Sequence, residues 1–162
     1  MITKDFLRSI DKSTIPDVAA TLDPADLERL VAWLSEKDDA VRYPSMLLLR
    51  QRSASTDDVF PYWDEFVGKL SNENSFQRSI GLTLLAENAR WDAGARTEKM
   101  LPRYLSLLED EKPVTVRQCI QNLQKIIAFH PSLSAPVVKS LTALDLQAVR
   151  QSMRKLVLTD IL

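Results

Sequence analysis

The chain has 162 residues, of which 45% are apolar and 27% are charged, and this balance is typical of one globular domain with a sizeable core. The formal net charge is −1, so no global field draws the chain toward nucleic acid or anionic lipid. A single cysteine, Cys119, and a single histidine, His130, exclude an intrachain disulfide and a metal site built from several Cys and His ligands.

The N-terminal sequence lacks the long apolar core of a signal peptide, and no apolar run approaches the roughly 18 residues that span a bilayer. These features predict a cytoplasmic protein. The whole chain holds three glycines, which disfavours glycine-rich phosphate loops and a β fold dense in turns.

Residues 1–22 carry two short helical patterns, and Phe6 and Leu7 lie on the apolar side of the first. We interpret this segment as an N-terminal cap over the first full repeat. A clear helix then follows, with Asp23 as its expected N-cap and Pro24 at its first position, where the missing N–H does no harm.

The rest of the chain predicts four helical hairpins, each an amphipathic helix, a polar turn and a second helix. Their expected ranges are 23–53, 54–91, 95–130 and 132–162. The second hairpin is predicted to begin with a cap at residues 55–56 and two aspartates in its first turn, which suits the helix dipole. Residues 91–98 are expected to form the longest polar surface loop. No segment alternates apolar and polar residues over the length of a strand, so the predicted class is all-α.

Internal self-similarity is the strongest signal in the sequence. Prolines of the first helices recur at spacings of 37, 41 and 34 residues, at Pro24, Pro61, Pro102 and Pro136. Arginines of the second helices recur at spacings of 36, 39 and 33 residues, at Arg42, Arg78, Arg117 and Arg150. A leucine follows each arginine by six residues, at Leu48, Leu84, Leu123 and Leu156. The residue before the arginine is valine in three hairpins and Gln77 in the other.

The residue before each arginine and the leucine seven positions later share one helix face, so we expect them to be buried together. The arginine lies about 100° around the helix from them and is expected to flank the core. Because one hairpin cannot bury its apolar stripe alone, stacking in series would bury the stripe between neighbours.

The first-helix prolines and the Asp…Val-Arg…Leu pattern of the second helices resemble HEAT repeats, in their bacterial HEAT-like form, over residues 23–160. Gln77 and Gly81 depart from that pattern. The resemblance implies a right-handed α-α superhelix, or solenoid, of about four hairpins whose second helices line the concave face. It also implies a protein that binds other macromolecules and does not catalyse.

We therefore expect a non-enzymatic scaffold or adaptor that binds another protein through the face of the second helices, without a cofactor or a metal. The candidate residues of this face are Arg42, Arg50, Arg78, Arg117, Gln121, Lys125, Arg150 and Arg154. Two interpretations of the repeated arginines stay open. Either each arginine bonds the aspartate or the carbonyls of an adjacent turn, or the row faces a ligand.

The four second helices carry ten basic and four acidic residues, a local balance of +6. This balance supports an alternative in which the same face binds the phosphate backbone of nucleic acid. A small HEAT-like DNA glycosylase is a weaker alternative, because no matching catalytic aspartate, tryptophan and arginine set is present. The last helix ends in an apolar run, Leu156 to Leu158, that would dimerise, meet a partner or be covered by Ile161 and Leu162.

Cys119 is expected to be a small buried hydrophobe, and His130 to lie at a helix end without a catalytic role. Trp33 and Trp63 fall on apolar stripes and are expected in the core. Trp91 opens the polar loop.

Overall fold

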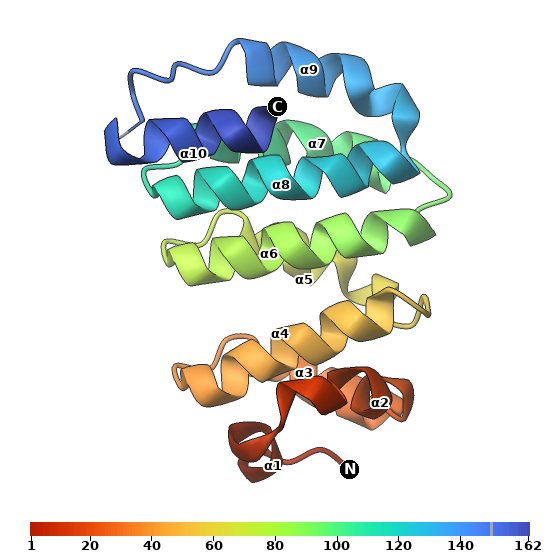
Figure 1. Cartoon of the computed structure of the whole chain (residues 1–162). Coiled ribbons are helices and arrows are strands. Elements are labelled where there is room, and N and C mark those ends of the chain that lie inside the picture. The colour runs from red at the N-terminus through yellow and green to blue at the C-terminus, as the bar shows by residue number, and fades with distance from the viewer. Residues whose placement is uncertain (150) are drawn as a thin grey trace.

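The computed structural model describes residues 1–149 and 151–162, and every regular element in this part of the chain is a helix (Figure 1). The all-α class predicted from the sequence is confirmed for these residues. The α-helices are α1 (Lys4–Ser9), α2 (Ile15–Ala20), α3 (Pro24–Trp33), α4 (Asp39–Ser53), α5 (Trp63–Lys69), α6 (Ser75–Asn88), α7 (Arg96–Leu105), α8 (Pro113–Phe129), α9 (Ser134–Thr142) and α10 (Gln151–Ile161).

The longer helices α4, α6 and α8 lie side by side in chain order, and α10 packs against α8 at the end of the series (Figure 1). Helix α3 packs against α4, α5 against α6, and α7 against α8. Each of these three second helices therefore touches both the first helix of its own pair and a neighbouring second helix. This order places their three N-terminal turns along one edge of the molecule.

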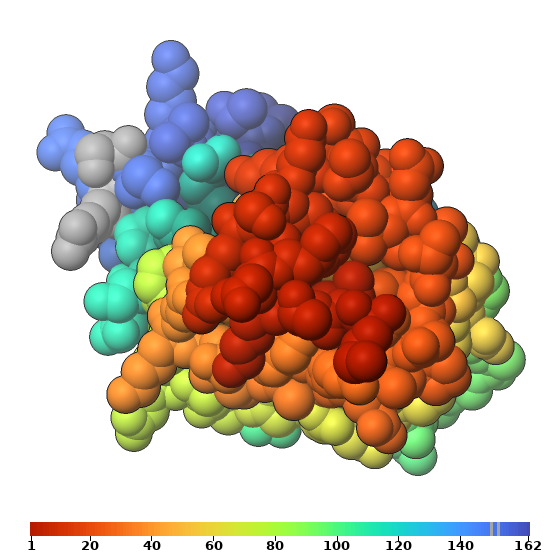
Figure 2. All heavy atoms as spheres, turned by 90° about the horizontal axis from the view of Figure 1, so that it is seen from below, coloured from red at the N-terminus to blue at the C-terminus, as the bar shows by residue number. Residues whose placement is uncertain are grey.

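The N-terminal helices α1 and α2 pack against α4 and cover one end of the molecule (Figure 2). Leu7 is buried, whereas Phe6 is 41% exposed, so only part of the predicted apolar side reaches the core. The predicted start of the next helix is confirmed, because the Asp23 carboxylate accepts the N–H of Asp26 at 2.7 Å and Pro24 opens α3.

The apolar stripe predicted on the second helices is buried in the first three of them, at Val41, Leu48, Gln77, Leu84, Val116 and Leu123. In α10 the prediction for Leu156 is wrong, because this side chain is 41% exposed and Val157 is buried instead. Helix α10 packs mainly against α8 across the layer, so its buried face follows from that neighbour and not from a hairpin of its own.

The predicted start of the second hairpin is also wrong. Helix α5 begins only at Trp63, after a short 3₁₀ turn, η2 (Phe60–Tyr62). The carboxylate of Asp58 does not serve a helix dipole but pairs with the guanidinium of Arg52 at 2.6 Å. This contact with the preceding helix fixes residues 55–58 as a turn.

The polar loop predicted at residues 91–98 is shorter than expected. A 3₁₀ turn, η3 (Ala89–Trp91), continues α6, and α7 already begins at Arg96, so that Pro102 lies well inside this helix. The buried carboxylate of Asp92 accepts the N–H of Thr97 at 2.6 Å and thereby caps the first turn of α7.

The three tryptophans occupy different environments. Trp63 is buried as predicted, but Trp33 is half-buried and lies beneath the ammonium of Lys4. Trp91 is also half-buried, and its indole N–H donates to the carbonyl of Ser53 at 2.7 Å. Trp91 therefore ties η3 back to the end of α4.

The two departures from the repeat pattern have a structural explanation. The side-chain amide of Gln77 donates to the carbonyl of Leu34 at 2.8 Å and its oxygen accepts from Lys69, so the residue links neighbouring helix pairs. At Gly81, an added Cβ would lie 2.8 Å from the carbonyl oxygen of Phe66, so glycine is what lets α5 and α6 approach closely.

Candidate functional site

A groove of about 460 Å³ runs across the N-terminal halves of α4, α6 and α8. Its lining comes from all three helices and consists of Asp39, Arg42, Tyr43, Met46, Ser75, Phe76, Ser79, Ile80, Thr83, Lys112, Pro113, Val114, Thr115 and Gln118. The groove therefore lies on the face of the second helices, where the sequence predicted a partner to bind.

Large apolar side chains stand exposed in this groove. Phe76 is 63% exposed, Val114 58% and Tyr43 42%. Phe76 and Val114 come from the first turns of α6 and α8, Tyr43 comes from the start of the second turn of α4, and all three line the same hollow. A contiguous apolar patch rimmed by polar residues is a common mark of an interaction site.

Helix capping places the first of these side chains. The side chain of Asn74 accepts the N–H of Phe76 at 2.9 Å, which fixes the ring in the first turn of α6, away from the buried stripe. The guanidinium of Arg42 lies 5.2 Å from the centre of the Phe76 ring, and the ammonium of Lys12 lies 5.1 Å from that of Tyr43. These cation–π contacts hold the two rings at the surface.

Polar groups on the groove wall retain capacity for hydrogen bonding. Ser75, Ser79 and Thr83 follow one another at four-residue spacing on α6, so they share one face of the helix. The side-chain oxygen of Gln118 is buried and accepts no hydrogen bond from the described part of the chain. The groove can thus bind an apolar side chain, and the half-buried hydroxyls of Ser75 and Ser79 can hydrogen-bond to the segment that carries it.

The repeated arginines that the structure describes are engaged within the protein. Arg42 donates to the carbonyls of Glu36 and Lys37, at 3.0 and 3.3 Å, and pairs with Asp39 at 2.7 Å. For Arg42, the first of the two interpretations is confirmed, in which the arginine bonds the adjacent turn.

Arg78 makes the same kind of contact in the next pair. It donates to the carbonyls of Asn72 and Glu73, both at 2.9 Å. Its guanidinium also pairs with Asp110, which belongs to the turn before α8, so this arginine joins two neighbouring pairs.

Arg117 differs from the first two, because its partner lies on α10. It donates to the carboxylate of Asp160 at 2.6 and 3.2 Å, and Gln121 donates to the same carboxylate at 2.9 Å. The hydrogen bonds from Arg117 hold the pKa of Asp160 below its ordinary value. The pair thereby fastens the last helix to α8.

A second series of hydrogen bonds, which the sequence did not reveal, runs from side chains at the C-terminal ends of the second helices to backbone carbonyls. Arg52 donates to the carbonyls of Ala19 and Ala20, at 3.1 and 3.0 Å. Arg90 donates to the carbonyl of Ala54 at 2.7 Å. In both cases a cation reaches the open carbonyls at the end of the preceding layer, where the helix dipole is negative.

His130 continues this series from the end of α8. Its Nε2 lies 2.7 Å from the carbonyl of Ala89, and since a carbonyl can only accept, Nε2 carries the hydrogen. The predicted position at a helix end is confirmed, and the contact is with the end of α6.

Most of the candidate basic residues therefore have structural partners. Lys125 pairs with the buried carboxylate of Glu87, which also pairs with Arg90, and Arg154 donates to the carbonyls of Gln147 and Val149. Arg50 is exposed. Arg150 lies outside the described residues.

The candidates and the groove overlap at Arg42, but Arg50, Arg78, Arg117, Gln121, Lys125 and Arg154 do not line it. Sequence reasoning missed its exposed residues, Tyr43, Phe76 and Val114. Each is a large apolar or aromatic residue within the first five positions of a second helix, and that shared placement was the available signal.

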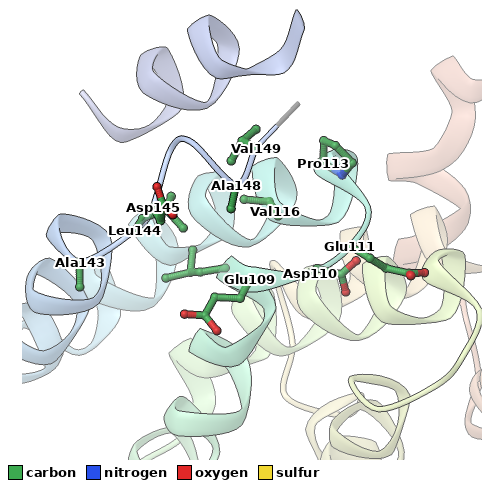
Figure 3. Close-up of a pocket in the computed structure, with 11 residues that line it drawn as sticks. Glu109, Asp110, Glu111, Pro113, Val116, Ala143, Leu144, Asp145, Ala148 and Val149 are labelled. Carbon is green, nitrogen blue, oxygen red and sulfur yellow. The ribbon is translucent and has the colours of Figure 1, made fainter. Parts of the chain in front are cut away.

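A second hollow, of about 440 Å³, lies on the other side of the first turn of α8. Figure 3 shows Ala148 and Val149, on the segment between α9 and α10, on the same side of α8 as Val116. Carboxylates surround this pocket, and they belong to Glu109, Asp110, Glu111 and Asp145.

Comparisons of the chain with protein-family models, with curated proteins and with solved structures found no match.

Cys119 is fully buried, as predicted, and its thiol donates to the carbonyl of Tyr104 at 3.4 Å. Burial raises the pKa of the Cys119 thiol, which keeps it protonated and unsuited to nucleophilic attack. Within the described residues, no three His, Cys, Asp or Glu side chains are placed to share a metal ion. None of the described helices is long and apolar enough to cross a membrane.

Proposed function

We propose that this protein is a non-enzymatic binding module that holds a segment of another protein in the groove across α4, α6 and α8. The observation that carries the proposal is the exposure of Phe76, Val114 and Tyr43 in one hollow formed by three successive second helices. A hollow of this size accommodates a few anchoring side chains, as in the recognition of a helix or an extended segment by a groove.

The serial packing of α4, α6 and α8, each backed by the first helix of its pair, supports a right-handed superhelix of HEAT-like hairpins. In such an arrangement the second helices line the concave face. The groove then corresponds to the surface that a solenoid offers to its partners.

Binding of nucleic acid receives less support, because the basic residues counted on this face are largely neutralised. Arg42, Arg78 and Arg117 pair with aspartates, and Lys125 pairs with Glu87. A phosphate backbone would have to compete with these carboxylates. The groove itself offers exposed apolar side chains, which do not bind phosphate.

A glycosylase function has little support, because the described residues of the groove include no carboxylate in a suitable environment. Such an enzyme needs a carboxylate held in its cleft, and the carboxylate that lines the groove, Asp39, is 75% exposed and pairs with Arg42. This environment provides no means of activating it as a base.

Selection from a phage-displayed library of random peptides against the full chain would test the proposal. We expect enriched peptides to share an aromatic or aliphatic anchor. Val114→Ser should weaken their binding about tenfold, because the bound peptide covers the apolar surface of Val114 and serine offers less of it. Val138→Ser is the matched control, since Val138 is 54% exposed on α9 and lies outside the groove.

Circular dichroism would verify that both variants remain folded. Equal weakening by the two variants, or no enriched peptide that depends on Val114, would contradict the proposal. A salt-dependent gel shift with generic duplex DNA would instead favour the nucleic-acid alternative.

A further inference from the structure

The apolar groove and the acidic pocket adjoin each other. Pro113, in the first turn of α8, lines both of them. A segment seated in the groove and continuing over the start of α8 would therefore meet the pocket next. The two hollows thus meet at Pro113 and differ in chemistry, since exposed apolar side chains line the first and carboxylates the second.

The acidic side chains of the pocket differ in how far they are neutralised. Asp110 accepts two hydrogen bonds from Arg78, and its side chain is only 5% exposed. Its negative charge is therefore neutralised inside the protein. Glu109 and Asp145 are exposed on the rim. Glu111 has a loose contact, 3.7 Å, with Lys112. The rim thus retains negative charge directed at solvent.

The inner wall of the same pocket is apolar. Leu108 and Val116 are buried beneath it, and Leu144 and Val149 contribute from the segment between α9 and α10 (Figure 3). An apolar wall below an anionic rim matches the side chains of arginine and lysine, which pack an aliphatic stem and keep a charged head near water.

The rim carboxylates do not form a metal site, because no three of the described acidic, His or Cys side chains converge on one point. A guanidinium or ammonium does not need such convergence. It can bind one carboxylate at a time through charge-assisted hydrogen bonds.

We propose that the segment bound in the groove carries an arginine or lysine beside its apolar anchor, and that this basic side chain enters the acidic pocket. The inference rests on the proposed function, since the groove seats the segment. It adds the chemical class of the partner: a basic amphipathic peptide segment, selected by charge complementarity with Glu109 and Asp145.

The test uses the peptides selected on the wild-type chain. We expect them to carry Arg or Lys near the anchor. In a peptide whose basic residue is arginine, we expect replacement of that arginine by citrulline, its neutral isostere, to weaken binding about tenfold. On the double variant Glu109→Gln/Asp145→Asn the same replacement should change nothing. Glu98→Gln is the control, because Glu98 is exposed on α7 and lies outside both hollows.

The outcomes separate the two proposals. Peptides that need Val114 but bind equally well with citrulline overturn this inference and leave the proposed function standing. A citrulline effect of the same size on the double variant also overturns it, since the basic side chain would then bind elsewhere. If no peptide depends on Val114, both proposals fail.

Discussion

Arg78 of α6 and Asp110, in the turn before α8, form a two-point ion pair that joins neighbouring helix pairs. The Nε–Oδ2 distance is 2.7 Å and the Nη2–Oδ1 distance is 2.9 Å, and the two side chains are 9% and 5% exposed. The guanidinium also donates hydrogen bonds to the carbonyls of Asn72 and Glu73. One side chain thus fixes a turn and the spacing to the next pair.

Removal of this arginine should be costly. Arg78→Met leaves the buried carboxylate of Asp110 without a counter-charge, so we expect the free energy of unfolding to fall by about 3–5 kcal/mol in urea titrations. Arg42→Met should cost less, because its partner Asp39 is 75% exposed. The double variant Arg78→Met/Asp110→Leu should recover part of the loss. Equal effects at Arg78 and Arg42 would contradict this prediction.

The close approach of α5 and α6 gives a second prediction. In Gly81→Ala the new methyl group would meet the carbonyl of Phe66 at 2.8 Å, so the helices must separate and the variant should lose about 1–3 kcal/mol. Gly68→Ala is the control on α5, because nothing lies within 4 Å of its added Cβ.

Alanine is the better helix former, so the control should leave stability unchanged or raise it by up to about 1 kcal/mol. Thermal and urea unfolding would show whether the free energy of unfolding falls in Gly81→Ala and stays the same or rises in Gly68→Ala. Equal effects would mean that the contact between the two helices is more adaptable than the distance indicates.

These contacts show what the sequence could predict and what it could not. Helical spacing identified the first three helix pairs and their buried stripe, because Val41, Leu48 and the equivalent residues of α6 and α8 are all buried against neighbouring helices. It failed for α10, where Leu156 is exposed. Helical spacing could not assign the role of Asp58, because an aspartate at this position suits the first turn of a helix as well as an ion pair. Only the position of Arg52 in space decides that this carboxylate belongs to a tertiary ion pair.

The groove was missed for a different reason. Periodicity reports the residues that face the core, and Phe76 and Val114 lie off that stripe, where any residue type is tolerated. The arginines stood out because they repeat, yet Arg42 and Arg78 bond the carbonyls of the turn before their own helix, and Arg117 pairs with Asp160 of α10. The residues that face a partner need not repeat, so the binding surface carried a weaker signal than the scaffold.

The pair between Arg117 and Asp160 predicts a pH dependence. Hydrogen bonds from Arg117 lower the pKa of Asp160 in the native state, so its stabilising contribution is complete above the ordinary carboxyl pKa of about 4. Below that value the unfolded chain takes up the proton first, and stability falls as the pH passes through the native pKa.

Asp160→Asn should therefore be less stable than the wild type at neutral pH and lose less stability in acid. Urea midpoints measured from neutral pH to about pH 3 would show the difference between the two chains shrinking. Asp145→Asn is the control, because Asp145 is exposed and has no role in this pair. A constant difference across the range would contradict the assignment.

The series at the C-terminal helix ends gives the last prediction. The guanidinium of Arg90 donates to the carbonyl of Ala54 and pairs with the buried carboxylate of Glu87, and it lies 4.7 Å from the centre of the Phe129 ring. It therefore touches three successive second helices or their ends. Arg90→Met should lower the free energy of unfolding by about 2 kcal/mol, since hydrogen bonds to charged groups are among the stronger ones.

Arg50→Met is the matched control, because Arg50 is exposed on α4 and methionine has nearly the same helix propensity as arginine. If this series of contacts joins neighbouring helices, the loss of stability should also be confined to particular helices. Amide hydrogen exchange should quicken in the last turns of α4 and α8, on either side of Arg90, while α2 and α3 keep their protection. If exchange rose evenly through the chain, Arg90 would contribute to global stability without joining these particular helices.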